Sequence, residues 1–388
     1  MADRLRIAQV VPTYLPLLGG KESYVWNAVE HLPEFDFEVL TARVPGLPAP
    51  PVGPQVRVHR FRPAESFRGP WAFPAAGPAV TVWGFLSLLR LRRQRRRSEA
   101  LGCAVVHSHW SDVEAVRALR GRVSPTTWDR VLAKVLAAAR FRQPTVFTDH
   151  SMLVQEMPDL YRRLLEHALR EYRLVLAVEP EGGDRAKALR DASRGTAEVA
   201  YLPNSVDTEA LRPRPDDRRP SVIAYLGRAN KAHWLVRELS LHLPEYRFLF
   251  GIAGYGRSME KWRAMRSERV DVRENVGPME LPSFLAHADL VVNPLLVHGM
   301  GRVTLEAFAA GLPVIGDLGA SRYPLVHGRT GLLTEPDPKA FASAVRDLMG
   351  NPPLLRDFGR EGRRIVEREF SNDVVLPRLA SWYRRLAA

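Results

Sequence analysis

The stretch from His298 to Gly316, HGMGRVTLEAFAAGLPVIG, constrains the fold of this chain more than any other segment. A Gly-x-Gly turn leads into an alanine-rich segment of helical pattern, which Gly311 and Pro313 end before the short apolar strand Val314–Ile315. Unpaired N–H groups at the start of such a helix lie at the positive end of its dipole and form a site for phosphate. Glu306 lies about one turn further in, where a carboxylate can bind ribose hydroxyls. The segment therefore predicts a site for a nucleotide diphosphate.

The same residues also fit an ordinary βα unit whose glycines only form a tight turn, because short glycine motifs occur by chance. The segment resembles, however, the donor-binding motif of the retaining family-4 glycosyltransferases, in which two glutamates flank F-G-L-V. Glu306 matches the second glutamate, and His298 stands in the place of the first. The F-G-L-V positions are occupied by Met300, Gly301, Arg302 and Val303. The resemblance implies that all six residues bind the donor.

Length and composition indicate at least two folded domains. A chain of 388 residues suggests two or three domains of about 150 residues each, and 46% hydrophobic residues suffice for sizeable cores. The single cysteine, Cys103, excludes an intramolecular disulfide framework and an all-cysteine metal site. The N-terminal segment lacks a long apolar stretch followed by a cleavage site, so we expect no secretory signal and a cytoplasmic location.

Short apolar runs alternate with helical stretches in both halves of the chain, which predicts an α/β protein with parallel sheets covered on both faces. In the first half the expected strands are Arg6–Val11, Cys103–His107, Thr145–Thr148, Leu174–Val178 and Val199–Leu202. In the second half they are Val222–Leu226, Arg247–Ile252, Leu290–Asn293 and Val314–Ile315. The resemblance implies that the two sheets form the GT-B fold, in which two Rossmann-like domains face each other across a cleft.

A proline-rich, charged segment around residues 211–220 interrupts this alternation and has the composition of a linker. We therefore expect residues 1–207 to form an acceptor-binding domain and 221–370 a nucleotide-sugar-binding domain, joined by a linker at 208–220. Residues 371–388 have a helical pattern, and we expect this helix to return to the first domain.

Three residues at strand ends are candidates for catalysis. Arg228 and Lys231 follow the first strand of the second domain, and cations at this edge of a parallel sheet face the usual ligand crevice. They match residues that neutralise the departing diphosphate, although Lys231 follows the arginine more closely than in the family and Ala232 replaces a glycine. His150 matches a histidine near the transferred sugar. The alternative is that these side chains are surface or structural residues.

Two further segments match donor contacts of the family. Gly19 and Gly20 correspond to a glycine pair that approaches the diphosphate from the first domain. Val276 lies in a loop that corresponds to the nucleobase contact. Either segment could also be a turn that binds no ligand.

The run VVHSHW, which includes His107 and His109, ends another strand of the first domain. His109, Trp110 and Asp112 are candidates for a wall of the acceptor pocket. The H-x-H spacing would suit a metal ion, but no third ligand is evident nearby, and we expect neither a metal nor a cofactor.

The net charge of +13, from 56 basic and 43 acidic residues, favours anionic partners. Part of the excess lies in residues 79–97, where an uncharged apolar run precedes RLRRQRRR. The run is shorter than the roughly 20 residues that span a bilayer, but it could lie on an anionic membrane at the inner face. The alternative is an ordinary helix of the first domain with solvated arginines. Nucleic-acid binding ranks third, because aromatic residues do not alternate with the basic ones.

The resemblance implies transfer of a hexose-type sugar from a UDP-, GDP- or dTDP-linked donor to an acceptor hydroxyl, with retained configuration and without metal. The acceptor could be a small molecule, a polysaccharide precursor or a lipid-linked compound. Two alternatives share the fold: a nucleotide-sugar epimerase, and a catalytically weak membrane or assembly partner. The second is kept because His298 replaces a glutamate.

Overall fold

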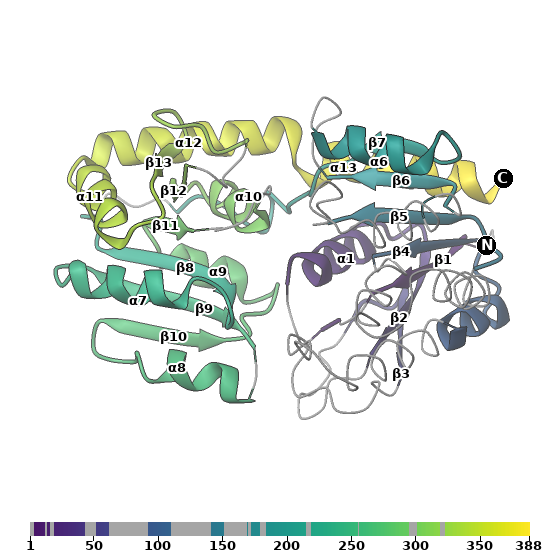
Figure 1. Ribbon diagram of the computed structural model, residues 1–388, viewed down its shortest axis with the longest axis horizontal. Coiled ribbons are helices and arrows are strands. Elements are labelled where there is room, and N and C mark those ends of the chain that lie inside the picture. Colours follow the sequence, from purple (N-terminus) through teal and green to yellow (C-terminus); the bar gives the residue numbers. More distant parts are fainter. Residues whose placement is uncertain are drawn as a thin grey trace, which may run out of the picture. The chain divides into compact units, whose positions relative to one another are not determined.

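The computed structural model shows two α/β units (Figure 1). The residues that it describes are 4–11, 14–15, 19–42, 52–61, 92–109, 141–150, 169, 172–178, 184–214, 219–254, 256–294, 301–318 and 323–388. By backbone contacts, unit 1 comprises Met1–Leu15, Ala28–Pro203 and Leu376–Ala388, and unit 2 comprises Pro16–Asn27 and Asn204–Val375. Contacts do not define binding roles, so the acceptor- and donor-binding domains with their limits stay predictions.

Unit 1 is built on a seven-stranded sheet with the order β3-β2-β1-β4-β5-β6-β7, in which all neighbouring strands are parallel. The strands are β1 (Arg6–Val10), β2 (Asp36–Ala42), β3 (Val56–Phe61), β4 (Val105–Ser108), β5 (Thr145–Asp149), β6 (Leu174–Ala177) and β7 (Glu198–Tyr201). The central strands β4, β5 and β6 are buried at every residue, as expected for a parallel sheet covered on both faces. Its helices are α6 (Asp184–Ser193), the helical residues 92–100 and the larger part of α13 (Asn372–Ala387), whereas α1 (Gly20–His31) is divided between the units, with residues 20–27 in unit 2.

Unit 2 is built on a six-stranded parallel sheet with the order β10-β9-β8-β11-β12-β13. The strands are β8 (Val222–Arg228), β9 (Arg247–Ala253), β10 (Val270–Glu274), β11 (Leu290–Asn293), β12 (Val314–Asp317) and β13 (Gly331–Thr334). The helices are α7 (His233–His242), the 3-10 helix η2 (Gly256–Met259), α8 (Glu260–Arg263), α9 (Leu281–Ala286), α10 (Arg302–Ala309), α11 (Pro338–Met349) and α12 (Pro352–Glu369).

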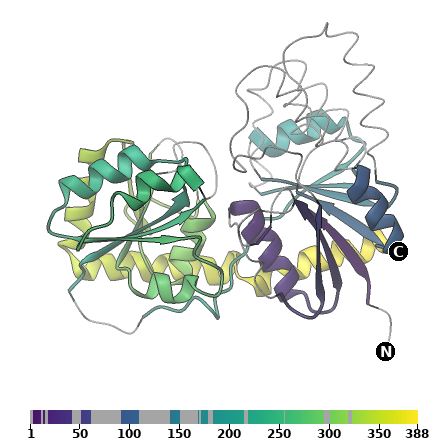
Figure 2. The same cartoon turned by 90° about the horizontal axis from the view of Figure 1, so that it is seen from below.

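Successive residues of the strands of unit 2 pack alternately into two hydrophobic cores, one on each face of the sheet. Ile223 of β8 packs with α7, α8 and α11, whereas its neighbour Ala224 packs with α9, α10 and α12. Figure 2 shows helices on both faces of this sheet. The arrangement confirms the predicted fold class, an α/β protein with two parallel sheets, and the predicted strands all occur within a few residues of their expected limits.

Four strands were not predicted: β2, β3, β10 and β13. Three of them, β3, β10 and β13, are edge strands, which have a neighbour on only one side. The sequences VRVHRF of β3 and VDVRE of β10 alternate apolar with charged residues, so they lack the continuous apolar run of a central strand. β2 contains Glu38, which is buried and paired with Arg57 and His59 of β3. A local sequence pattern cannot reveal partners that lie about 20 positions away.

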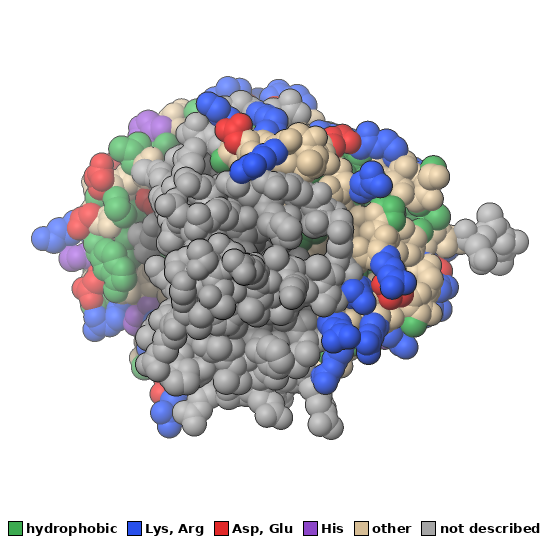
Figure 3. All heavy atoms as spheres, turned by 45° about the vertical axis from the view of Figure 1, so that its right-hand side comes forward, with side chains coloured by type: hydrophobic (Ala, Val, Ile, Leu, Met, Phe, Trp, Pro, Cys, Tyr) green, Lys and Arg blue, Asp and Glu red, His purple; other side chains and the backbone are tan. Residues whose placement is uncertain are grey.

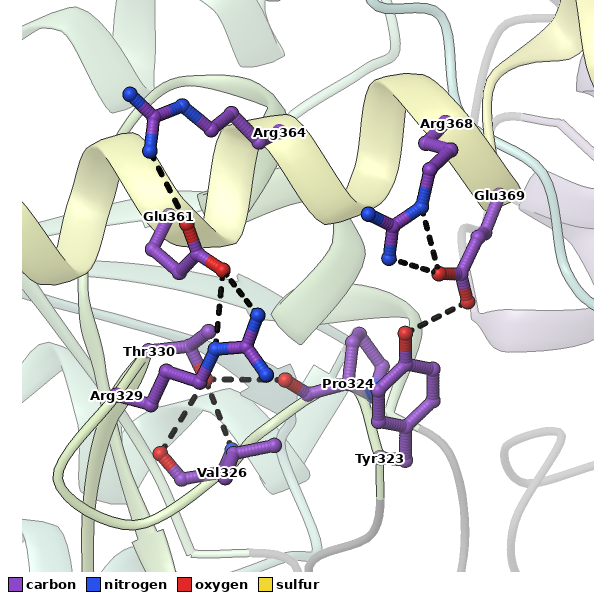
Figure 4. Close-up of polar contacts among 9 residues, drawn as sticks. All are labelled: Tyr323, Pro324, Val326, Arg329, Thr330, Glu361, Arg364, Arg368 and Glu369. Atoms are coloured by element: carbon purple, nitrogen blue, oxygen red, sulfur yellow. Dashed lines mark hydrogen bonds and ion pairs between the residues drawn. The ribbon is translucent and has the colours of Figure 1, made fainter.

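The turn between β12 and β13 is fixed to α12 by side chains (Figure 4). Glu361 of α12 accepts a hydrogen bond of 3.0 Å from Nε of Arg329, and this bond holds the pKa of Glu361 below its usual range. The hydroxyl of Tyr323 donates to Glu369 at 2.6 Å. Inside the turn, Oγ1 of the buried Thr330 accepts from the amide of Val326 at 2.8 Å. These contacts secure the edge of the sheet against α12.

Helix α12 approaches α10 closely because two glycines of α12 face α10. A Cβ placed on Gly359 would lie 2.0 Å from the carbonyl oxygen of Gly311, and one on Gly362 would lie 2.5 Å from the ring of Phe308. Gly311 ends α10 with φ +71°, and the amide of Leu312 donates to the carbonyl of Ala307 at 2.9 Å. The predicted stop of the helix at Gly311 is thus observed, and α12 packs directly against that stop.

We expect the substitution Gly359→Ala to destabilise the protein by about 1–3 kcal/mol, because the added methyl group meets backbone rather than a movable side chain. Arg356→Ala, at an exposed position of the same helix, is the control and should change stability by at most about 0.5 kcal/mol. The measurement is the shift of the urea denaturation midpoint. Equal midpoints for the two variants would show that α12 does not need this close approach.

Candidate functional site

The strand order of each sheet reverses beside its first strand. In unit 2 the chain runs outward from β8 to β9 and β10 and then returns to β11 on the other side of β8. In unit 1 it runs from β1 to β2 and β3 and returns to β4. Ligands of open parallel sheets bind outside the carboxyl ends of the strands at such a reversal. The pairs β8/β11 and β1/β4 therefore mark where each unit is built to hold a ligand.

Helix α10 begins directly beyond the carboxyl end of β11. Its N-cap is Gly301, with φ −66° and ψ 120°, and this residue has no side chain that could cap the helix. Asn293, the last residue of β11, donates from Nδ2 to Oγ1 of Thr304 at 3.0 Å and so fixes the first turn to the strand. The first amides of α10, those of Arg302 and Val303, stand where the sequence predicts a diphosphate contact.

Glu306 is buried in the second turn of α10, and its carboxylate is paired within the helix. Its Oε1 accepts a hydrogen bond from Nε of Arg302 at 2.9 Å, and both side chains are 10% exposed. Burial raises the pKa of Glu306, and the charge and hydrogen bond of Arg302 oppose that rise. Nη1 of Arg302 donates in addition to the carbonyl oxygen of Ser205 at 2.9 Å. The side chain of Arg302 is therefore bonded to Glu306 and Ser205. This leaves the backbone amide of Arg302 for the predicted contact with the donor.

Arg228, the last residue of β8, lies beside the glycine pair at the start of α1. Its Nη2 is 3.4 Å from Oε2 of Glu22, which is 2% exposed. A Cβ on Gly19 would lie 2.0 Å from the same Nη2, whereas one on Gly20 would meet nothing within 4 Å. Only glycine at position 19 lets the guanidinium take this place. All four residues belong to unit 2.

Lys231 follows Arg228 in the same turn, since its amide donates to the carbonyl of Arg228 at 2.9 Å. Partial loss of hydration and then repulsion from Arg228 lower the pKa of Lys231, although the residue as a whole is exposed. Ala232, at the position of the family's glycine, has φ 47°. This is the left-handed region, which glycine enters without strain and which other residues rarely adopt.

The loops after β9 and β10 are joined by Asn275. It has φ 53°, accepts from the amide of Gly254 at 3.0 Å and donates to the carbonyl of the same residue at 2.9 Å. Val276 follows and packs on the core face of α9 and α10, as does Val303. The predicted nucleobase loop and the first turn of α10 therefore contact the same core.

In unit 1, two of the predicted residues meet at the carboxyl ends of β4 and β5. Nδ1 of His109 is 3.0 Å from Nε2 of His150, and Nε2 of His109 is 2.8 Å from Oε1 of Gln9. Gln9 also donates to the hydroxyl of Tyr383 at 2.8 Å. That hydroxyl lies 2.6 Å from Nδ1 of His107, whose Nε2 lies 2.6 Å from Oγ1 of Thr148. A connected polar network thus underlies His150.

Sequence reasoning missed Gln9, Glu22 and Tyr383. Tyr383 lies in the helix expected at 371–388, and its hydroxyl enters the network of unit 1. Glu22 had one usable signal, an acidic residue in the first helical turn after two glycines. Gln9 had none, because a polar residue inside an apolar strand reveals no partner.

Four predicted site residues lie outside the described residues: Trp110, Asp112, His298 and Met300. The apolar part of the predicted membrane segment, residues 79–91, lies outside them as well. Within the described ranges, no helix is both long and apolar enough to cross a bilayer. The same part of the chain contains no group of three His, Cys, Asp or Glu residues placed to hold a metal ion.

Comparison with known proteins matches this architecture to one family. Residues 220–351 match the family model "Glycosyl transferases group 1". The whole chain is similar in structure to sucrose-phosphate synthase from Thermosynechococcus elongatus, with a TM-score of 0.74 and 18% identity over 99% of both chains. It is also similar to HepE from Anabaena in complex with UDP and glucose, with a TM-score of 0.66 and 16% identity over 98% of this chain and 100% of that one.

Relatives found by sequence similarity are also named as enzymes that act on sugars. A GDP-mannose-dependent alpha-(1-6)-phosphatidylinositol monomannoside mannosyltransferase from Mycolicibacterium smegmatis is 31% identical over 43% of this chain and 51% of its own length. An alpha-maltose-1-phosphate synthase from the same organism is 25% identical over 75% of this chain and 81% of its own. The chain spans about half the length of the mannosyltransferases that it matches. Residues 220–351 therefore match the glycosyltransferase group 1 family, and the chain as a whole has the GT-B fold of these solved structures.

The buried His107 gives a test of the unit 1 network. Desolvation lowers its pKa from 6.5 to about 3, so the folded protein keeps the ring neutral while the unfolded chain takes up a proton below about pH 6.5. The contribution of His107 to the free energy of unfolding is fully present above pH 6.5. It decreases as the pH falls toward 3, by up to about 1.4 kcal/mol per pH unit. We expect His107→Gln to reduce this slope.

The direct measurement is an NMR titration of the His107 ring in the wild-type protein, which does not depend on the variant folding. Its carbon-bound proton resonances should stay constant between pH 8 and pH 5. A titration midpoint near 6.5 would contradict the dry, fully bonded environment of the ring.

Proposed function

We propose that this protein is a retaining glycosyltransferase that moves a hexose-type sugar from a nucleotide diphosphate to an acceptor hydroxyl. The observation that carries the proposal is the set of groups at the reversal between β8 and β11. The uncapped start of α10, the buried carboxylate of Glu306 and the cation Arg228 all stand at the carboxyl ends of these neighbouring strands. Amides and a cation suit a diphosphate, and a carboxylate suits the hydroxyls of a ribose.

In this proposal the bond between the anomeric carbon and the diphosphate breaks, and the electron pair leaves with the diphosphate. Arg228 and Lys231, with the amides at the start of α10, stabilise that charge as it develops. The acceptor oxygen forms the new bond to the anomeric carbon and releases its proton, which the departing diphosphate takes up. Burial and then repulsion from Arg228 lower the pKa of Lys231, and an anion bound beside the two cations would relieve that repulsion.

The remaining assignments follow the family motif. Gly19, Gly20 and Val276 approach the donor diphosphate and nucleobase, and His150 lies near the transferred sugar. His109, which is 3.0 Å from His150, belongs with Trp110 and Asp112 on the acceptor side. One relative is named as GDP-mannose-dependent, and a protein of similar structure was solved in complex with UDP and glucose. The donors to screen are therefore UDP-, GDP- and dTDP-linked hexoses. We place the reaction in the cytoplasm.

The substitution Glu306→Gln tests the proposal, because it keeps the side-chain volume and removes the charge. We expect donor affinity to fall at least about tenfold, through loss of a charged hydrogen bond to ribose hydroxyls. Calorimetric titration with UDP- and GDP-linked hexoses measures this, after a thermal-shift screen has identified the stabilising donor. Glu268→Gln, at an exposed and unbonded position, is the control. Unchanged affinity in Glu306→Gln, or a screen without any stabilising nucleotide sugar, would refute the assignment.

We further propose that exposed arginines of residues 92–97 contact an anionic membrane surface, where a lipid-linked acceptor would reside. Arg92, Arg93 and Arg96 are exposed and form no ion pair with any described residue, whereas Gln94 and Ser98 on the opposite side are buried. Lys and Arg side chains are also prominent on the described part of the face in Figure 3. The mannosyltransferase relatives are named for a phosphatidylinositol acceptor.

Replacing these three arginines by glutamine should weaken binding to vesicles of anionic lipid at least about tenfold, since each basic residue contributes about 1 kcal/mol near such a surface. Cosedimentation at low salt is the measurement, and neutral vesicles should bind neither protein. The control replaces the exposed Arg356, Arg360 and Arg364 of α12 in the same way. Equal binding of the two triple variants would contradict the membrane proposal and favour an ordinary solvated helix.

A further inference from the structure

The pair Arg302 and Glu306 is oriented against the needs of its own helix. Arg302 occupies the first position of α10, at the positive end of the dipole, and no acidic residue lies in the first turn. A cation at a helix start is unfavourable, and an i,i+4 pair supports a helix better when the acid comes first. Helix stability therefore does not explain why an arginine stands at this position.

The geometry explains it through Glu306. The carboxylate is nine-tenths buried, and Oε1 accepts from Nε of Arg302 at 2.9 Å. Its other oxygen, Oε2, accepts no hydrogen bond from any residue that the structure describes. Because Oε1 is already bonded to Arg302, Oε2 is the oxygen that remains to accept a hydrogen bond from a ligand. The free hydroxyls of a ribose are donors of the required kind.

Arg302 is itself held from a second direction. Nη1 donates to the carbonyl of Ser205 at 2.9 Å, and the hydroxyl of Ser205 accepts from Asn27 at 2.8 Å. The neighbouring Val206 donates to the carbonyl of Phe370 and accepts from the amide of Asn372, at 2.9 and 3.0 Å. The guanidinium therefore lies between a fixed backbone oxygen and the carboxylate, so it cannot swing into solvent without breaking both bonds.

We propose that Arg302 is a positioning residue: it holds Oε1 of Glu306 so that Oε2 is presented to the ribose hydroxyls of the donor. This inference rests on the proposed function of Glu306. It adds a role that the family motif does not give to the position, where the motif has an apolar residue. The expected consequence is an effect on donor affinity rather than on the turnover rate.

The charge of Arg302 also opposes protonation of the acid. Burial raises the pKa of Glu306, and among the described residues Arg302 is the charged group that lowers it. Arg363 of α12, which packs against α10, donates instead to the carbonyl of Ala309 at the far end of α10. Removing Arg302 should therefore raise the pKa of Glu306 further.

The experiment compares the full-length wild type with Arg302→Met and Arg302→Lys. In Arg302→Met, the affinity for UDP or GDP should fall at least about tenfold at pH 7 and recover as the pH rises, with the midpoint of this pH dependence displaced upward from that of the wild type. Arg302→Lys keeps the charge and should restore the midpoint, with weaker binding at every pH because it lacks the fork that reaches Ser205. Arg364→Met, at an exposed arginine, is the control.

A loss of affinity that is equal at all pH values would overturn the proposal, since a purely structural role does not move the midpoint.

The second readout needs no nucleotide. The carboxyl carbon of Glu306, labelled with ¹³C and assigned with Glu306→Gln, should titrate at higher pH in Arg302→Met than in the wild type. An unchanged titration overturns the inference even if nucleotides bind. If no nucleotide binds but the titration shifts, the proposed function fails while the positioning role stands. Should Arg302→Met not fold, Arg302→Gln is measured in its place.

Discussion

The removal of the Glu306 carboxylate from water is the constraint on which the site of unit 2 depends. Burial raises the pKa of this carboxylate, and the charge of Arg302 in the preceding turn opposes that rise. Arg302 also donates to the carbonyl of Ser205. The segment at Ser205 is in turn fixed by backbone hydrogen bonds of Val206. Glu306 is therefore connected by hydrogen bonds to several segments that lie far apart in the sequence.

The two units use the same topological device with different chemistry. In each, the chain reverses direction beside its first strand, and polar groups gather at the carboxyl ends of the strands there. Unit 2 places cations, amides and an acid at this point, which suits an anionic donor. Unit 1 places His109 beside His150 and connects them through Gln9 to buried groups. This second set consists of imidazole and amide groups, which can orient hydroxyl groups through hydrogen bonds.

The central strands and the helix stop at Gly311 were predictable, because their signals are local. Continuous apolar runs mark strands that are covered on both faces, and a glycine followed by proline marks the end of a helix. The edge strands β3 and β10 were missed because alternating charged residues hide them. Gln9 and Glu22 were missed for a related reason: a buried polar residue is recognised by its partner, and the partners Tyr383 and Arg228 are hundreds of positions away.

The sequence alone determined the class of fold, the resemblance to the family motif and the position of helix α10, since all three are encoded in residues that are close together along the chain. Only the tertiary structure decided how the side chains of that motif are used. It directs Arg302 back to Glu306 and Ser205, brings Gly19 against Arg228, and joins His107 to Tyr383. The physical reason is that a buried polar group must find a hydrogen-bond partner, and folding, not sequence proximity, selects which one it finds.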